Sequence, residues 1–314
     1  MERADEPSAV SNVVDGGVGN NVVQAGAIHG DVHLHNGPRL IPTTTPPARP
    51  FGPGAELGVD GVTCLIHDFP THEGPSADGG AVLRAGRCSL ITPDGRRTGY
   101  GWLRQVQIHH DTQQARAEVA ALADEHQLNP GRFVRTARSA TLVTEWPESR
   151  AGKPCDSLES LLGPTPMTDS GRLYHLSAGL VGLCKTLATL HNRGRTHRAL
   201  TPAGLVVRDD GRLVLRDLGL AVRPFRPGEH ACDYQAPEQR PRTAGTPGPH
   251  TDVYQLGAVA YHLVTGRVPH RATLPVHTWA RTAPVGLAAA IDAALAPDCG
   301  RRPDPGAFAR MVLG

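Results

Sequence analysis

Six leucines between residues 173 and 190 recur at alternating spacings of three and four residues. Because an α-helix turns once in about 3.6 residues, this spacing puts all six side chains on one helical face. Gly194 follows the last leucine and is typical of a helix C-terminus. A continuous leucine face has to be buried, so the segment predicts a helical core around it. The six are Leu173, Leu176, Leu180, Leu183, Leu187 and Leu190.

The chain before this helix mostly favours strands. Residues 81–92 and 98–108 alternate in the manner of strands and flank Pro-Asp-Gly at 93–95, a turn sequence that favours a hairpin. Residues 140–146 predict a further strand. Residues 111–126 predict a helix, because their apolar side chains recur at helical spacing.

The chain after the leucine helix favours helices. A short hairpin is predicted at residues 205–208 and 212–216, and helices are predicted at 252–265, 284–295 and 304–313. A strand-rich part followed by a helix-rich part predicts an α+β fold of two lobes.

Composition divides the chain into three regions. Residues 1–36 are rich in Gly, Asn and Val, and residues 37–56 are a Pro/Thr linker that should be extended. The globular domain is expected over residues 57–314, with an N-lobe over about 57–146 and a C-lobe over about 150–314.

Charge and cysteine content exclude several classes of protein. The 32 basic and 30 acidic residues nearly cancel, which argues against a nucleic-acid or membrane-surface binder. The six cysteines form no CxxC pair, so we expect reduced thiols and no metal site. The acidic N-terminus lacks the features of a secretory signal, and no membrane-length apolar run occurs. We therefore expect a soluble, cytoplasmic protein.

Five motifs occur in order along the second half of the chain, at residues 196–206, 216–221, 234–238, 251–269 and 301–303. They resemble, in turn, the catalytic loop, the metal-binding motif, the end of the activation segment, the central C-lobe helix and the late Arg-Pro pair of eukaryotic-type protein kinases, which bacteria also contain. The resemblance covers residues 57–314. It implies a β-rich N-lobe and a helical C-lobe.

Three positions of the catalytic loop that carry functional side chains in the kinase family have other residues in this sequence. Ala199 stands where the family has the Asp that accepts the substrate proton, and Thr201 replaces the Lys that steadies the transferred phosphate. Gly204 replaces the Asn that binds the second metal ion. Losing the base and a metal ligand together should cost several orders of magnitude in rate, so the domain resembles a pseudokinase.

The N-lobe departs from the family as well. Arg104 stands at the position of the Lys that grips the nucleotide phosphates, and its planar fork is not equivalent to an ammonium group. Lys153 and Lys185 are the only lysines in the sequence, so no other alignment supplies one. Glu118 is at the position of the helical Glu, and we expect an Arg104–Glu118 pair. Residues 74–80 resemble the glycine-rich loop without its spacing.

The positions that remain are mainly structural. His197 and Arg198 should brace the catalytic loop, Asp252 should bind its backbone, and Glu238 should pair with Arg302; Gly219 is part of the metal-binding motif. Asp217 is the one chemical group retained and the candidate for nucleotide or metal binding, although a single carboxylate is a poor Mg²⁺ site without phosphates. Between Asp217 and Glu238 there is no Ser or Thr, which excludes Ser/Thr phosphorylation there.

The N-terminal region contains a near-repeat, in which residues 12–17 recur nine residues later as 21–26. Residues 12–35 contain short Val-rich strands with Asn, Gln and Gly and no Pro, which suits stacked cross-β arches; a disordered tail is the alternative. The centre resembles the Val/Ile-Gln-x-Gly core of RIP homotypic interaction motifs and of bacterial amyloid signalling motifs. The residues expected in self-assembly are Asn21, Val22, Val23, Gln24, Ala25, Gly26 and Ile28.

Two functions follow from these patterns. The first is a catalytically inactive signalling adaptor or effector that requires no cofactor. It would be recruited through residues 12–35 by a sensor protein carrying a similar motif, in bacterial immunity or regulated cell death. The second is a divergent Ser/Thr protein kinase with weak ATP and Mg²⁺ binding and residual phosphotransfer.

Overall fold

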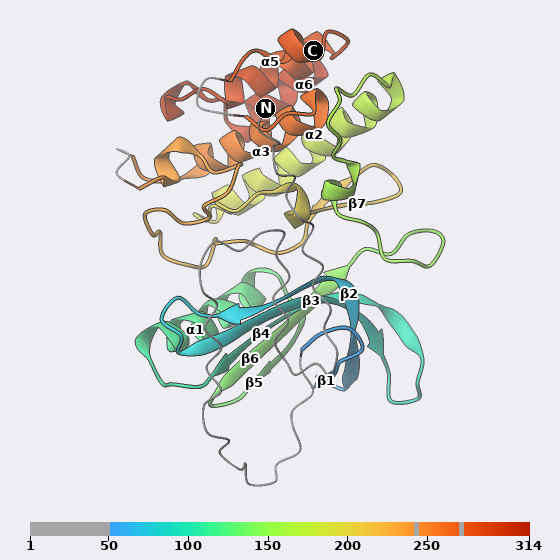
Figure 1. The fold of residues 1–314 in the computed structure, drawn as a ribbon, viewed down its shortest axis with the longest axis vertical. Coiled ribbons are helices and arrows are strands. Elements are labelled where there is room, and N and C mark those ends of the chain that lie inside the picture. The colour runs from blue at the N-terminus through green and yellow to red at the C-terminus, as the bar shows by residue number, and fades with distance from the viewer. Residues whose placement is uncertain (1–50, 242–244, 270–272) are drawn as a thin grey trace, which may run out of the picture. The chain divides into compact units, whose positions relative to one another are not determined.

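The computed structural model describes residues 51–241, 245–269 and 273–314. The predicted self-assembly segment and most of the linker therefore lie outside the described residues. The first part of the described chain is a six-stranded antiparallel sheet with one helix, and the second part is a group of helices with a short hairpin (Figure 1). The predicted α+β arrangement of a strand-rich and a helix-rich lobe is confirmed.

The N-lobe sheet has the strand order β1-β2-β3-β4-β6-β5. Helix α1 (Gln113–Leu128) packs on it through a face of small and aliphatic residues that includes Ala115, Val119 and Leu122. Thr112 caps the helix by accepting a hydrogen bond from the Ala115 amide. The strands are β1 (Glu56–Val59), β2 (Val62–Pro75), β3 (Ala81–Ile91), β4 (Arg97–Ile108), β5 (Arg132–Arg135) and β6 (Ser139–Trp146).

The C-lobe is built around the helix that carries the six leucines, α2 (Ser170–Asn192). The other helices are α3 (Pro249–Thr265), α4 (Val276–Trp279), α5 (Val285–Ala294) and α6 (Pro305–Leu313). Strands β7 (Leu205–Val207) and β8 (Leu213–Leu215) form the predicted hairpin. Short 3-10 turns lie at Leu158–Leu161, Pro202–Gly204, Pro237–Gln239 and Cys299–Arg301.

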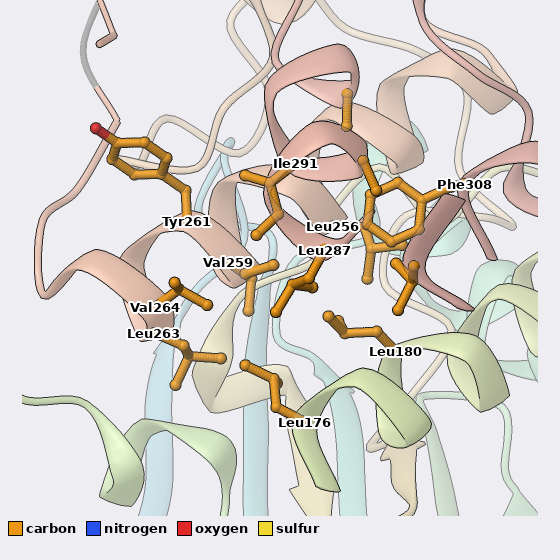
Figure 2. Close-up of a cluster of buried hydrophobic side chains, with 14 of the residues drawn as sticks. Leu176, Leu180, Leu256, Val259, Tyr261, Leu263, Val264, Leu287, Ile291 and Phe308 are labelled. Carbon is orange, nitrogen blue, oxygen red and sulfur yellow. The ribbon is translucent and has the colours of Figure 1, made fainter. Parts of the chain in front are cut away.

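The leucine face of α2 forms the centre of the C-lobe core. Figure 2 shows Leu176 and Leu180 directed toward side chains of α3, α5 and α6, among them Leu256, Leu287 and Phe308. By length and composition α2 is the one helix of the described residues that could cross a membrane. All six of its leucines are buried in this core, however.

Every predicted strand and helix is present, with ends that differ by at most three residues. The N-lobe core extends before the predicted domain start at residue 57, because it contains Ala55, and Phe51 packs against the same cluster. The predicted glycine-rich loop at 74–80 is also partly wrong. Residues 74 and 75 end strand β2, and the turn itself runs from Ser76 to Gly80.

Candidate functional site

The backbone of the catalytic-loop segment is held by α3. The fully buried Asp252 carboxylate accepts hydrogen bonds from the amides of His197 at 2.9 Å and Arg198 at 2.7 Å. Arg198 has a left-handed φ of +59°, and the side chains of Gln239 and Gln255 donate to its carbonyl. These bonds offset the backbone strain. The predicted contact of Asp252 with the loop backbone is present.

The three replaced positions of this loop carry no ionisable side chain. Ala199 is half-buried, and the Thr201 hydroxyl accepts a hydrogen bond from the Gly204 amide, which caps the short 3-10 turn. A Cβ atom on Gly204 would lie 3.5 Å from the Thr201 hydroxyl and 3.9 Å from the Ala199 carbonyl. A Cβ atom at residue 204 would therefore make only ordinary van der Waals contacts.

Asp217 is occupied by contacts within the protein. One carboxylate oxygen accepts from Arg216 Nε at 2.9 Å, and the other accepts from the Gly219 amide at 2.9 Å. Burial would raise the pKa of this carboxyl, but the charges of Arg216, Arg104 and His197 outweigh it and hold the pKa well below its usual range. Among the described residues, no group of three or more His, Cys, Asp or Glu side chains could hold a metal ion.

Gly219 is required for steric reasons. Its φ is +57°, and a Cβ atom there would lie 2.6 Å from the His197 ring. The His197 ring in turn lies 3.1 Å from the Asp217 carbonyl. Gly219 and His197 therefore fix how the 217–219 segment lies against the catalytic loop.

The predicted Arg104–Glu118 pair is wrong. Arg104 pairs with Glu125 at 2.5 Å, and Glu125 also accepts a hydrogen bond from the Leu218 amide at 3.0 Å. Glu118 instead binds Arg223, with its Oε2 atom 2.8 Å from Nη2 and 3.1 Å from Nε. Glu118 and Glu125 are seven residues apart and lie on one face of α1, so the sequence pattern could not distinguish them.

The segment from Asp217 to Glu238 is held by carboxylates. Arg198 pairs with Glu229 at 3.1 Å, with only 8% and 7% of their side chains exposed. At the other end, the buried Glu238 forms two hydrogen bonds with Arg302, at 2.8 and 3.0 Å. The predicted Glu238–Arg302 pair is present. The segment is thus anchored without any phosphorylated side chain.

Two tryptophans of the N-lobe sheet pack in one buried cluster with a residue of the C-lobe. Trp102 of β4 and Trp146 of β6 are 3% and 2% exposed, and both belong to a core cluster that includes Val206 of β7. The two rings lie 5.8 Å apart between centres. The Arg216 guanidinium stacks on Trp102 at 4.4 Å, and Trp146 Nε1 donates to the Cys155 carbonyl at 2.9 Å.

The sequence patterns did not predict this cluster. Trp102 lies two residues before Arg104 in the same strand, so both side chains are on one face of the sheet. The sequence signal that could have indicated the cluster was a large aromatic residue, Trp102, on the same face of the strand as Arg104. Trp146 and Val206 could not be linked to it, because they are far apart in sequence.

The lobes, the strand order and the catalytic-loop anchor together define a protein kinase-like fold. The PknI kinase domain of Mycobacterium tuberculosis, solved as a double mutant, aligns with a TM-score of 0.51 and 17% identity, over 82% of this chain and 96% of that one. No protein-family model matches the chain.

Curated kinases match shorter parts of the chain. Sperm motility kinase 3A of Mus musculus is 37% identical over 90 residues, which is 26% of this chain and 17% of that protein. A probable serine/threonine-protein kinase of Clostridium acetobutylicum is 30% identical over 139 residues, which is 42% of this chain and 20% of that protein. The chain thus spans about a fifth of these relatives.

Proposed function

We propose that the domain is a pseudokinase that acts as a protein-binding adaptor or effector in the cytoplasm. In active protein kinases, the nucleotide lies between the lobes and its phosphates are held by a Lys, two metal ions and a glycine-rich loop. The observation that carries the proposal is the cluster of Trp102, Trp146 and Val206, in which buried side chains of the two lobes pack together.

The ionic contacts around this cluster support the same proposal. Arg104 is neutralised by Glu125, and Asp217 is neutralised by Arg216. We expect nucleotide or Mg²⁺ binding to break both pairs, of which Arg104–Glu125 is largely buried and Arg216–Asp217 partly buried, and to move Trp102, which stacks on Arg216. Breaking a largely buried ion pair costs free energy, so the two pairs oppose the binding of either ligand.

The full chain should therefore neither bind Mg-ATP nor transfer its phosphate. Because a ligand that binds only the native state raises the melting temperature, we expect no shift with Mg-ATP. The double variant Ala199→Asp/Gly204→Asn should also stay inactive toward a generic protein substrate with labelled ATP, since the two ion pairs and the tryptophan cluster remain. Labelling by the wild type that disappears in Asp217→Ala would contradict the proposal and favour the divergent kinase.

We further propose that residues 12–35 recruit the domain by homotypic cross-β assembly with a sensor protein that carries a similar segment. The support is the near-repeat with its Val-Gln-Ala-Gly centre at residues 23–26, whose resemblance to amyloid signalling motifs points to bacterial immunity or regulated cell death.

Assembly by this segment predicts a position-specific effect of proline. The full-length protein should form thioflavin-positive, sedimentable assemblies, and Val23→Pro should abolish them, because proline removes a ladder donor. Thr44→Pro, in a linker that already contains several prolines, is the matched control and should assemble normally. A wild type that stays monomeric and dye-negative at high concentration would contradict the assembly proposal.

A further inference from the structure

A cavity lies apart from the tryptophan cluster. It has a volume of about 410 Å³ and opens between the end of α1, the last turns of α2, strand β8 and the segment after it. That volume falls within the range of small-molecule sites in proteins. It is lined by Leu128, Asn129, Thr186, Thr189, Leu190, Arg193, Leu213, Val214, Leu215, Asp217 and Leu218.

The walls of this cavity are mostly aliphatic. Leu190 and Leu213 are buried, whereas Leu128, Val214, Leu215 and Leu218 remain partly accessible. An apolar ligand body could cover this accessible surface, and removing it from water is favourable by about 25 cal/mol per Å². Asp217 also lines the cavity, but its carboxylate is already satisfied by Arg216 and Gly219.

The polar groups of the cavity come from α2 and from the end of α1. Arg193 is exposed, and no carboxylate of the described residues lies within ion-pair distance of it; its hydrogen bond is to the Leu128 carbonyl at 3.4 Å. Within the same described part of the chain, the side chains of Thr186 and Asn129 make no hydrogen bond. One unneutralised cation and two neutral polar groups therefore flank an aliphatic surface.

We propose that this cavity binds a small amphipathic anion, with an apolar body against the leucines and a carboxylate, sulfonate or phosphate group on Arg193. A guanidinium binds such groups through charge-assisted hydrogen bonds, whereas an uncharged apolar ligand would leave Arg193 unpaired. The ligand would touch both α1 and the C-lobe, so it stabilises their contact. This site depends neither on nucleotide binding nor on the N-terminal assembly.

The test uses 8-anilinonaphthalene-1-sulfonate as the probe with the full-length protein. We expect saturable fluorescence enhancement from one site and a raised melting temperature. Arg193→Gln should raise the dissociation constant of the probe about fivefold to tenfold, the size expected for the loss of an exposed charge-assisted hydrogen bond. Arg195→Gln removes the same charge from an exposed residue outside the cavity and should bind the probe as the wild type does.

Two further measurements locate the probe. Thr186→Trp places a bulky side chain in the cavity wall and should abolish binding, and an unchanged far-ultraviolet circular dichroism spectrum would show that the variant is folded. The uncharged analogue N-phenyl-1-naphthylamine should bind at least about fivefold more weakly than the sulfonate. Equal binding by Arg193→Gln and wild type, retained binding by Thr186→Trp, or equal affinity for the two probes would overturn the proposal.

Discussion

Replacing Arg302 by alanine is expected to lower the free energy of unfolding by about 3 to 5 kcal/mol. The Arg302 side chain is fully buried, forms two hydrogen bonds with Glu238, and also donates to the carbonyls of Ala296, His250 and Pro297. Truncation would leave the Glu238 carboxylate buried without its partner, which costs more than the loss of an exposed pair.

Urea unfolding followed by circular dichroism measures this effect. Arg301→Ala is the matched control, because Arg301 is the exposed neighbour of Arg302 and takes part in no ion pair with a described residue. We expect that control to stay within about 0.5 kcal/mol of the wild type. Similar stabilities of the two variants would mean that the Glu238–Arg302 pair does not hold the end of the activation segment.

Replacing Trp102 by alanine is expected to lower the free energy of unfolding by a similar amount, about 3 to 5 kcal/mol, because it removes a large side chain that is only 3% exposed. The loss also removes the stacking partner of Arg216 and the ring that contacts Trp146. Since Trp102 links β4 to Val206 of β7, we also expect weaker association of the two lobes, measured as faster amide hydrogen exchange in β7.

The third tryptophan provides the comparison for this variant. Trp279 lies in α4, is only half-buried and stacks on Arg267 at 3.8 Å. Trp279→Ala should therefore destabilise the protein less than Trp102→Ala and leave hydrogen exchange in β7 unchanged. If Trp102→Ala were no more destabilising than Trp279→Ala, the tryptophan cluster would not be a core that joins the lobes.

Local patterns were sufficient for most of the elements and for several contacts. The leucine spacing predicted α2, and the order of the kinase-like motifs predicted the two-lobed fold together with the contacts of Asp252 and Arg302. Strand β2 was not predicted, because residues 62–75 contain Gly, Pro and several polar residues that are typical of loops. The β2–β3 ladder nevertheless extends to Pro75, with a shift of register between Ile66 and Thr71.

The errors at the site concern partners that are distant in sequence. Arg104 pairs with Glu125 and not with Glu118 because of the position of α1. Glu125 reaches both Arg104 and the Leu218 amide, while Glu118 binds Arg223. Nothing in the spacing of α1 distinguishes these two carboxylates. The choice depends on where the activation segment packs.

The sequence by itself determined that the residue types typical of the kinase catalytic positions are replaced. Folding cannot change the residues that stand there, which are Ala199, Thr201, Gly204 and Arg104. It also determined the periodic elements, because helical and strand spacing is a property of neighbouring residues. Only the tertiary structure decided which side chains of the two lobes pack together. Trp102, Trp146 and Val206 meet because the sheet and the β7 hairpin are brought together, and close packing of side chains from distant segments depends on that geometry rather than on spacing.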